Sequence, residues 1–360
     1  MEGRNLIKPF QLLLLISTAQ TGICIVVLPS LLSKEAGHDG WITLVMASVI
    51  AIALSMLTIA LLKRYPDNNI YEINRFIFGK IIGTVMSTLL VLYMFAATVS
   101  GSGFFIYIIR GTLLQETPPW ILTPMLTIPS FYLVWHGLKN MSRFLYITIF
   151  TYLIIVVFFG LLFKEMRLSF LLPVGEAGTD RMLASLPTGF FAFAGFELLA
   201  FFYPYVTDKR KAAKYCIWAT LASLVFFLIS TIISISVLGH NFLNILSTPF
   251  FRLSSVYNAP VLERVDLYIT SIWLVPMACS LRNYIFAAFD GLLKVFGLKK
   301  TKLIFIIYFF IVQVLAGLIR DFNQMLQIFS TIRITGFCVS FFLAACLLLS
   351  FIRKKGVVVK

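Results

Sequence analysis

Charged residues are scarce in this sequence of 360 residues. Only 12% of the residues are Asp, Glu, Lys or Arg, whereas 60% are hydrophobic, and the mean hydropathy is +0.95. This composition excludes a soluble globular domain, in which about 25% of residues are charged. Apolar stretches of about 20 residues are long enough to cross the hydrocarbon core of a bilayer. We therefore expect an all-α integral membrane protein that is embedded in the lipid bilayer.

The sequence also lacks the residue clusters on which most enzymes depend. Its three histidines have no carboxylate at ligand spacing, and it contains no Gly-rich phosphate loop, nucleophile elbow or metalloprotease motif. The five cysteines form no metal-like pair and are scattered along the chain, at Cys24, Cys216, Cys279, Cys338 and Cys346. We expect neither an enzymatic activity nor a bound metal or cofactor.

Acidic residues are half as numerous as basic ones, 15 against 30, so the net charge is +15. With the N-terminus in the cytoplasm, most basic residues fall on the cytoplasmic side, among them Arg4, Lys63, Arg64, Lys209, Arg210, Lys211, Lys299, Lys300, Arg353 and Lys354. Most acidic residues fall on the other side, among them Glu35, Asp39, Glu116, Glu176, Asp180 and Asp321. This positive-inside pattern predicts that both termini are cytoplasmic. It also explains the basic charge without a nucleic-acid partner.

About ten apolar stretches are long enough to be transmembrane helices. They cover residues 10–32, 41–62, 82–112, 119–136, 144–164, 183–204, 213–238, 262–289, 302–319 and 334–352. No connecting loop is long enough for a folded soluble domain, so residues 1–360 are expected to form a single transmembrane domain. Any large output domain must then belong to a partner protein.

Two of these stretches are interrupted near their middle. The first carries Thr21, Gly22 and Ile23 at mid-membrane depth, and the sixth carries Ala194, Gly195 and Phe196. Unwound backbone is tolerated at that depth only where it lines a protein cavity. Breaks in spans 1 and 6 are typical of inverted-repeat transporters, here with halves of about 8–164 and 181–352. The alternative interpretation of Gly22 is a glycine placed for close helix packing.

A single carboxylate, Glu197, lies among apolar residues directly after the second break. Burial of an ionised carboxylate in a bilayer is costly, so an acid at this position indicates a functional role. Three roles are open: contact with a ligand ammonium, exchange of a proton, or hydrogen bonding that locks the broken helix.

Two further spans present polar and aromatic residues on one helical face. Tyr93, Ala97, Gly101, Phe104 and Tyr107 recur at three or four residues in the third span. Asp266, Trp273, Met277, Ser280 and Tyr284 do so in the eighth. Such stripes fit the wall of a cavity, although tight helix packing gives the same pattern. Arg282 falls on the opposite face of the eighth span, where its side chain is expected to extend toward the cytoplasmic surface.

Several segments, in order along nearly the whole chain, resemble one known family. They are LPSLLSKEAGHDGWIT at 28–43, RYPDNNIYEINRFIFGKIIG at 64–83, ETPPWIL at 116–122, GLKNMSR at 137–143, LLP at 171–173, GFE at 195–197 and ERVDLYITSIW at 263–273. The family is the permease-like B subunit of endospore germinant receptors, within the amino acid–polyamine–organocation transporter superfamily.

This resemblance implies a LeuT-like fold that binds a nutrient germinant, typically an amino acid, at its centre. It implies a complex with a larger A subunit and a lipoprotein C subunit in the inner membrane of the spore. The family's pocket positions correspond to Gly22, Tyr93, Ala97, Ala194, Ser280 and Tyr284. The sequence departs from relatives at Ile23-Cys24, where a second glycine is frequent, and at Cys279-Ser280, where some members carry threonines.

Two functions are compatible with these features. In the first, the protein senses a nutrient and transmits a conformational change to its partners, without net transport. In the second, it is an amino acid permease that is coupled to protons through Glu197. No second intramembrane acid aligns with Glu197, which weakens a proton relay. A scaffold or a passive conduit for water or ions is a third possibility.

Overall fold

The computed structural model describes residues 6–257, 264–319 and 322–352. In these ranges the chain is a bundle of α-helices, and its one β-type contact is an isolated parallel bridge between Ile7 and Val206. The first half contains α1 (Pro9–Ala36), α2 (Gly40–Arg64), α3 (Ile70–Phe78), α4 (Lys80–Thr112), α5 (Pro119–Trp135), α6 (Leu138–Phe144) and α7 (Ile147–Leu161). The second half contains α8 (Gly178–Ala184), α9 (Leu186–Phe191), α10 (Leu199–Phe202), α11 (Ala212–Leu238), α12 (His240–Leu243), α13 (Pro249–Val256), α14 (Val265–Phe296), α15 (Lys302–Gly317) and α16 (Phe322–Ile352).

Short 3-10 helices connect or extend several of these elements. They are η2 (Gly37–Asp39), η3 (Leu162–Glu165), η4 (Leu168–Leu171), η5 (Phe196–Leu198), η6 (Tyr203–Tyr205) and η7 (Lys209–Lys211). The sixth predicted span is therefore built from α8, α9, η5, α10 and η6 in sequence.

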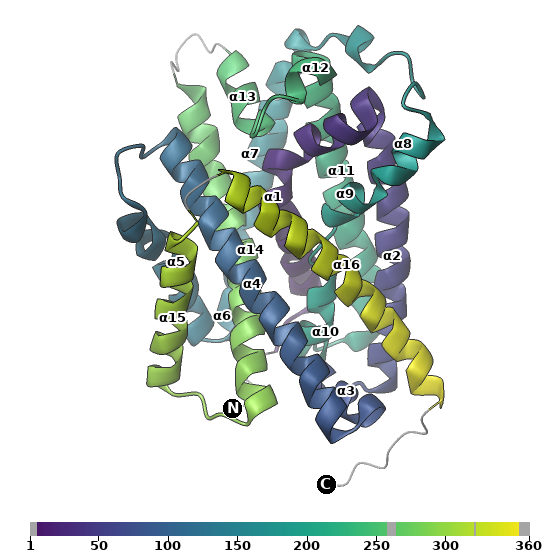
Figure 1. Cartoon of the computed structure of the whole chain (residues 1–360), viewed down its shortest axis with the longest axis vertical. Helices are drawn as coiled ribbons and strands as arrows, with labels where there is room; N and C mark the ends of the chain where they lie inside the picture. Colours follow the sequence, from purple (N-terminus) through teal and green to yellow (C-terminus); the bar gives the residue numbers. More distant parts are fainter. Residues whose placement is uncertain (1–5, 258–263, 320–321, 353–360) are drawn as a thin grey trace.

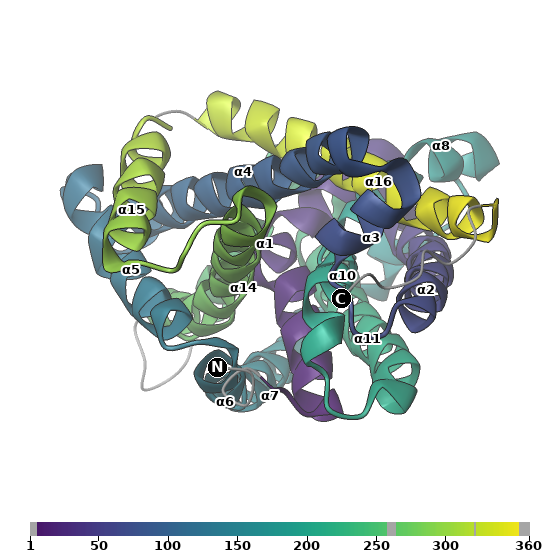
Figure 2. The same ribbon diagram turned by 90° about the horizontal axis from the view of Figure 1, so that it is seen from below.

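Helix α1 lies in the interior of the bundle, and α2, α4, α11, α14 and α16 surround it (Figures 1 and 2). It packs against α11 on one side and α14 on another, and most of its side chains are buried. Helices α5, α7 and α15 lie at the periphery and expose large apolar side chains such as Trp120, Phe150 and Phe310. Exposed apolar side chains on the outer helices are expected where lipid replaces water as the solvent.

Each of the ten predicted spans coincides with a helix or a broken helix. By length and composition, six segments of the described chain can cross a membrane, or up to seven if the bent pair in the sixth span is one segment. One of the six, Pro9–Arg64, contains both α1 and α2, while α5 and α15 have only 17 and 16 residues. The protein is an integral membrane protein, and its division into ten spans stays a prediction.

Helix α1 begins and α16 ends at the same end of the bundle, as an even number of spans requires (Figure 1). That this end is cytoplasmic, and that the two halves form an inverted repeat, also stay predictions. Arg4, residues 262–263, Asp321 and residues 353–360, on which part of the charge and span argument rests, lie outside the described residues.

Candidate functional site

The sixth span breaks at Gly195, as the sequence predicts. Its two helical parts, Gly178–Phe191 and Phe196–Tyr205, are bent by 46°. Gly195 has φ +120°, and a Cβ atom there would lie 2.7 Å from Ala19 Cβ. Only glycine accepts this backbone conformation freely, and no other residue leaves room for α1. The break therefore packs directly on the middle of α1.

Side chains of α1 bind the backbone that the break exposes. The side-chain amide of Gln20 donates to the carbonyl oxygen of Phe193 at 3.2 Å, and the thiol of Cys24 lies 3.6 Å from the carbonyl oxygen of Phe191. A buried carbonyl without a partner is costly in an apolar environment. These contacts make the break a stable part of the fold.

The predicted break in the first span is absent. Helix α1 is continuous from Pro9 to Ala36 and passes through Thr21, Gly22, Ile23 and Pro29 without a non-helical turn. A Cβ atom on Gly22 would overlap Ser280 Cβ on α14. Gly22 therefore permits close packing of two helices, which is the alternative interpretation given above.

Helix α14 supplies the contacts that accompany this close approach. Three of its side chains donate to backbone carbonyl oxygens of α1: Trp273 Nε1 to Gly22 at 2.9 Å, Ser280 Oγ to Ala19 at 3.3 Å and Asn283 Nδ2 to Leu15 at 3.1 Å. Because a carbonyl oxygen has two lone pairs, it can accept these bonds while it stays in the helix. The polar groups of the two helices are thus paired without unwinding α1.

Glu197 lies immediately after the break and is fully buried. Its Oε2 accepts the N–H of Gly195 at 2.6 Å, and its Oε1 accepts the hydroxyls of Tyr93 at 2.9 Å and Tyr284 at 3.4 Å. No ion pair joins Glu197 to a basic side chain within the described parts of the chain. The carboxylate therefore connects the broken span to α4 and α14 through hydrogen bonds.

A small cavity lies beside these two tyrosines, between α1, the broken span, α4, α14 and α16. Its volume is about 40 Å³. Residues of the predicted breaks and of the two predicted faces line it: Ile23, Tyr93, Ala97, Gly101, Ala194, Met277, Ser280 and Tyr284. A single water needs ~10–15 Å³ of cavity volume, so the central space can hold a few waters. It is far smaller than the ~300–1,000 Å³ of typical small-molecule sites. We call it the central cavity.

Five further residues at or beside the two predicted breaks surround the central cavity without lining it. Thr21 faces α7, where its hydroxyl is 2.6 Å from that of Tyr152. Gly22 packs on α14, Gly195 packs on α1, and Phe196 stacks edge-on against Phe190. Glu197 lies behind Tyr93 and Tyr284.

Sequence reasoning missed one wall of the central cavity. Phe329 and Ile332 line it from α16, and Ser100 lines it from α4 with a buried hydroxyl that has no partner among the described residues. Apolar residues three apart in an apolar helix carry no signal that separates a cavity wall from ordinary packing. Ser100 lies on the face of α4 next to Ala97, and this position was the available clue.

Two residues of the eighth span lie elsewhere than expected. Asp266 forms an ion pair with Arg264 at 2.9 Å near the start of α14, away from the central cavity. Arg282 does not extend to the surface: its side chain is buried, with the guanidinium carbon 5.2 Å from the centre of the Phe144 ring. The Phe144 ring stabilises the guanidinium by a cation–π contact, in place of the hydration that was expected at the surface.

Comparisons with known proteins match nearly the whole chain. The family model described as "Spore germination protein" covers residues 6–318. Spore germination protein B2 of Bacillus subtilis (strain 168) is 25% identical over 303 residues, which are 81% of this chain and 80% of that protein. Spore germination protein A2 of the same organism is 24% identical over 83% of this chain and 84% of its own length. Spore germination protein GerQB of Bacillus cereus is 20% identical over 85% of this chain and 84% of that protein.

A solved structure supports the fold. The crystal structure of MhsT in complex with L-phenylalanine superposes with a TM-score of 0.54 and covers 97% of this chain and 99% of that chain, at 14% sequence identity. MhsT has a LeuT-like transporter fold, so the predicted all-α, LeuT-like fold is confirmed. The unwound turn in α1 is absent, and the number of spans, the inverted repeat and the side on which the termini lie stay predictions.

Proposed function

The chain belongs to the spore germination protein family, and we propose that it is the nutrient-sensing, permease-like subunit of a germinant receptor. In this role it binds a small nutrient in the central cavity, and we propose that this nutrient is an amino acid. Binding then shifts a conformational equilibrium that partner subunits read. We further propose that these partners are a receptor A subunit and a lipoprotein C subunit in the inner membrane of the spore.

The observation that carries this proposal is the carboxylate of Glu197, which lies behind the cavity wall and is shared by two wall residues. Tyr93 and Tyr284 line the central cavity and donate to the same oxygen of Glu197. An amino-acid-sized solute must displace wall residues, because the cavity measures only about 40 Å³. Movement of either tyrosine alters its hydrogen bond to the broken span. A ligand that prefers the widened cavity therefore shifts the equilibrium toward it, by its difference in affinity for the two states.

The second candidate function is a proton-coupled amino acid permease. It is favoured by the burial of Glu197 and by the likeness in fold to a transporter that was crystallised with L-phenylalanine. In that mechanism Glu197 exchanges a proton while the bundle alternates between two open states.

The deciding experiment follows the fall in optical density of spores that lack this gene, against single amino acids, sugars and nucleosides. We expect loss of the response to one nutrient, restored by the wild-type gene and not by Ala97→Leu, which fills the central cavity. An unchanged response to every nutrient contradicts a sensing role. In that case, uptake of one of the tested nutrients by proteoliposomes of the purified protein would favour the permease.

A further inference from the structure

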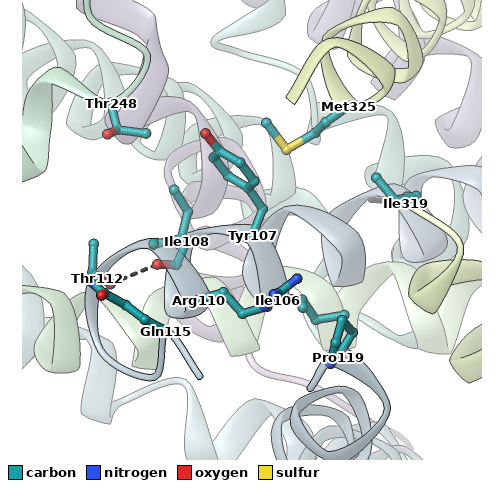
Figure 3. Close-up of a pocket in the computed structure, with 11 residues that line it drawn as sticks. Ile106, Tyr107, Ile108, Arg110, Thr112, Gln115, Pro119, Thr248, Ile319 and Met325 are labelled. Carbon is teal, nitrogen blue, oxygen red and sulfur yellow. Dashed lines mark hydrogen bonds between the residues drawn. The ribbon is translucent and has the colours of Figure 1, made fainter. Parts of the chain in front are cut away.

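A second, larger cavity lies at the end of the bundle away from the start of α1. Its volume is about 360 Å³, and its polar lining comes from Tyr107, Arg110, Thr112, Gln115 and Thr248 (Figure 3). Sites for small molecules typically measure ~300–1,000 Å³. Unlike the central cavity, this one is large enough for an amino-acid-sized solute without any movement of its walls. We call it the Arg110 pocket.

Arg110 supplies the charge of this pocket. Its side chain is exposed, and it forms no ion pair or hydrogen bond with any residue in the described ranges. It is also the only charged side chain among the described residues that line the pocket. A guanidinium group presents planar, paired donors that match a carboxylate in a bidentate arrangement. The pocket therefore has the charge and the geometry to select an anion.

The remaining walls favour an apolar body on that anion. Ile106, Ile319 and Met325 contribute apolar surface, and Figure 3 shows Met325 and Tyr107 across the pocket from Gln115. The hydroxyl of Thr112 is already used, because it donates to the carbonyl oxygen of Ile108 at 2.7 Å. A hydrated inorganic anion gains little from these apolar walls, whereas a carboxylate with an aliphatic chain fits both parts.

An aromatic layer separates the Arg110 pocket from the central cavity. On α16, Met325 lines the former and Phe329, one helical turn on, lines the latter. Between them, the Phe104 ring lies 5.1 Å from the Phe329 ring and 6.3 Å from the Trp273 ring, centre to centre. The two cavities thus share the facing surfaces of α4 and α16. A solute that passes from one cavity to the other must displace rings of this layer.

We propose that the Arg110 pocket is a distinct binding site for a small aliphatic carboxylate, which is held there before it passes the aromatic layer. Only the passage of the carboxylate through the aromatic layer to the central cavity rests on the function proposed above. Binding to Arg110 is a separate property and is tested separately.

The test measures binding of radiolabelled 4-methylpentanoate, and of its uncharged amide, to the full-length protein purified in lipid nanodiscs. We expect Arg110→Gln to weaken binding of the acid by tenfold or more and to leave the weak binding of the amide unchanged. Arg110→Lys should restore part of the affinity, since it keeps the charge and loses the bidentate geometry.

A second variant fills the pocket without touching Arg110. Gly111 lines it, and a Cβ atom there would meet nothing within 4 Å, so Gly111→Leu is expected to fold and to abolish binding. Gly160→Leu on α7 is the matched control, because Gly160 also has open space and lies outside the pocket. Equal affinity of the wild type, Arg110→Gln and Gly111→Leu for the acid overturns the proposal, as does the absence of binding to the wild type.

Ala97→Leu separates this site from the central cavity. If the Arg110 pocket binds on its own, Ala97→Leu retains binding of the acid, even when the nutrient response of spores is lost. If Ala97→Leu abolishes binding and Arg110→Gln does not, the acid binds in the central cavity. That result overturns the Arg110 site and leaves the proposed function intact.

Discussion

Tyr93 on α4 and Tyr284 on α14 donate hydrogen bonds to the same carboxylate oxygen, Oε1 of Glu197, at 2.9 and 3.4 Å. The other oxygen accepts the N–H of Gly195 at the break of the sixth span. One buried side chain thus connects three segments, since Tyr93 and Tyr284 lie 104 and 87 positions from Glu197 in the sequence. Any widening of the central cavity that moves Tyr93 or Tyr284 must change this arrangement.

Replacement of Glu197 by Gln should destabilise the protein, because Gln offers one acceptor oxygen where the carboxylate offers two. If that oxygen keeps the N–H of Gly195, the amide nitrogen faces the hydroxyls of Tyr93 and Tyr284, which can then no longer donate to this side chain. We expect a loss of about 1–3 kcal/mol in the free energy of unfolding. Tyr93→Phe removes one neutral donor and keeps the bond to Gly195, so its effect should be smaller. Thermal unfolding of the purified variants in detergent measures both.

The nutrient response of spores that carry Glu197→Gln or Glu197→Leu shows whether the charge of Glu197 or its hydrogen bonding is required. A response that survives Glu197→Gln and is lost in Glu197→Leu assigns a structural role to the side chain. The opposite result is that Glu197→Gln is stable and abundant in the membrane but gives no nutrient response. The charge of Glu197 is then needed, which favours proton coupling.

Gly22→Ala should destabilise the contact between α1 and α14, since the added Cβ overlaps Ser280 Cβ. Overpacking of this kind costs about 1–3 kcal/mol. Ser280→Gly removes the overlapping atoms, so the double variant should recover part of the loss, with a coupling of roughly 0.5–3 kcal/mol in a double-mutant cycle. Gly111→Ala on α4 is the control, because that position is open. Additive effects in the cycle would contradict the close contact.

Gly195→Ala should reduce the stability of the protein more than Gly22→Ala does. The second substitution Ala19→Gly should restore only part of the lost stability. The substitution adds a clash with Ala19 and also places an L side chain at φ +120°. Removal of the Ala19 methyl group relieves the first effect only, because an incompatible backbone conformation persists at a cost above ~1 kcal/mol. The yield and melting temperature of the three variants test this. Full recovery in the double variant would show that the backbone at Gly195 is unstrained.

These two glycines show how far the sequence alone determines the site. Gly195 is followed two residues later by an isolated carboxylate, and this local pattern correctly predicts a break. Gly22 has neighbours that fit either an unwound turn or close packing. The choice depends on Trp273, Ser280 and Asn283, whose bonds to α1 span 251 to 268 positions. Local sequence carries no information on contacts of that range.

The α16 wall of the central cavity was unpredictable for a different reason. Phe329 and Ile332 are two apolar residues in a helix that is apolar over most of its length. A polar residue in an apolar span stands out, but an apolar one does not. The polar residues Tyr93, Ser280 and Tyr284 could therefore be anticipated, and the apolar residues of α16 could not.

The size of the central cavity should set which nutrient is recognised. Ala97→Leu adds three carbon atoms to a wall that encloses only about 40 Å³, so we expect the response to the normal nutrient to fall below detection. Ile332→Ala removes volume from the opposite wall on α16 and should extend the response to a bulkier solute of the same class. Because truncation of a buried aliphatic side chain costs about 2–5 kcal/mol, the amount of each variant in the spore membrane must be measured alongside.

Ala96→Leu is the matched control for this series. Ala96 precedes Ala97 on α4, but its side chain is exposed on the outer surface of the helix and does not line the central cavity. It should leave the nutrient profile unchanged, because it adds the same volume outside the cavity. If Ala96→Leu and Ala97→Leu reduce the response equally at equal protein levels, the effect comes from α4 as a whole. If Ala97→Leu leaves the profile intact, the nutrient binds elsewhere and the central cavity is a packing defect.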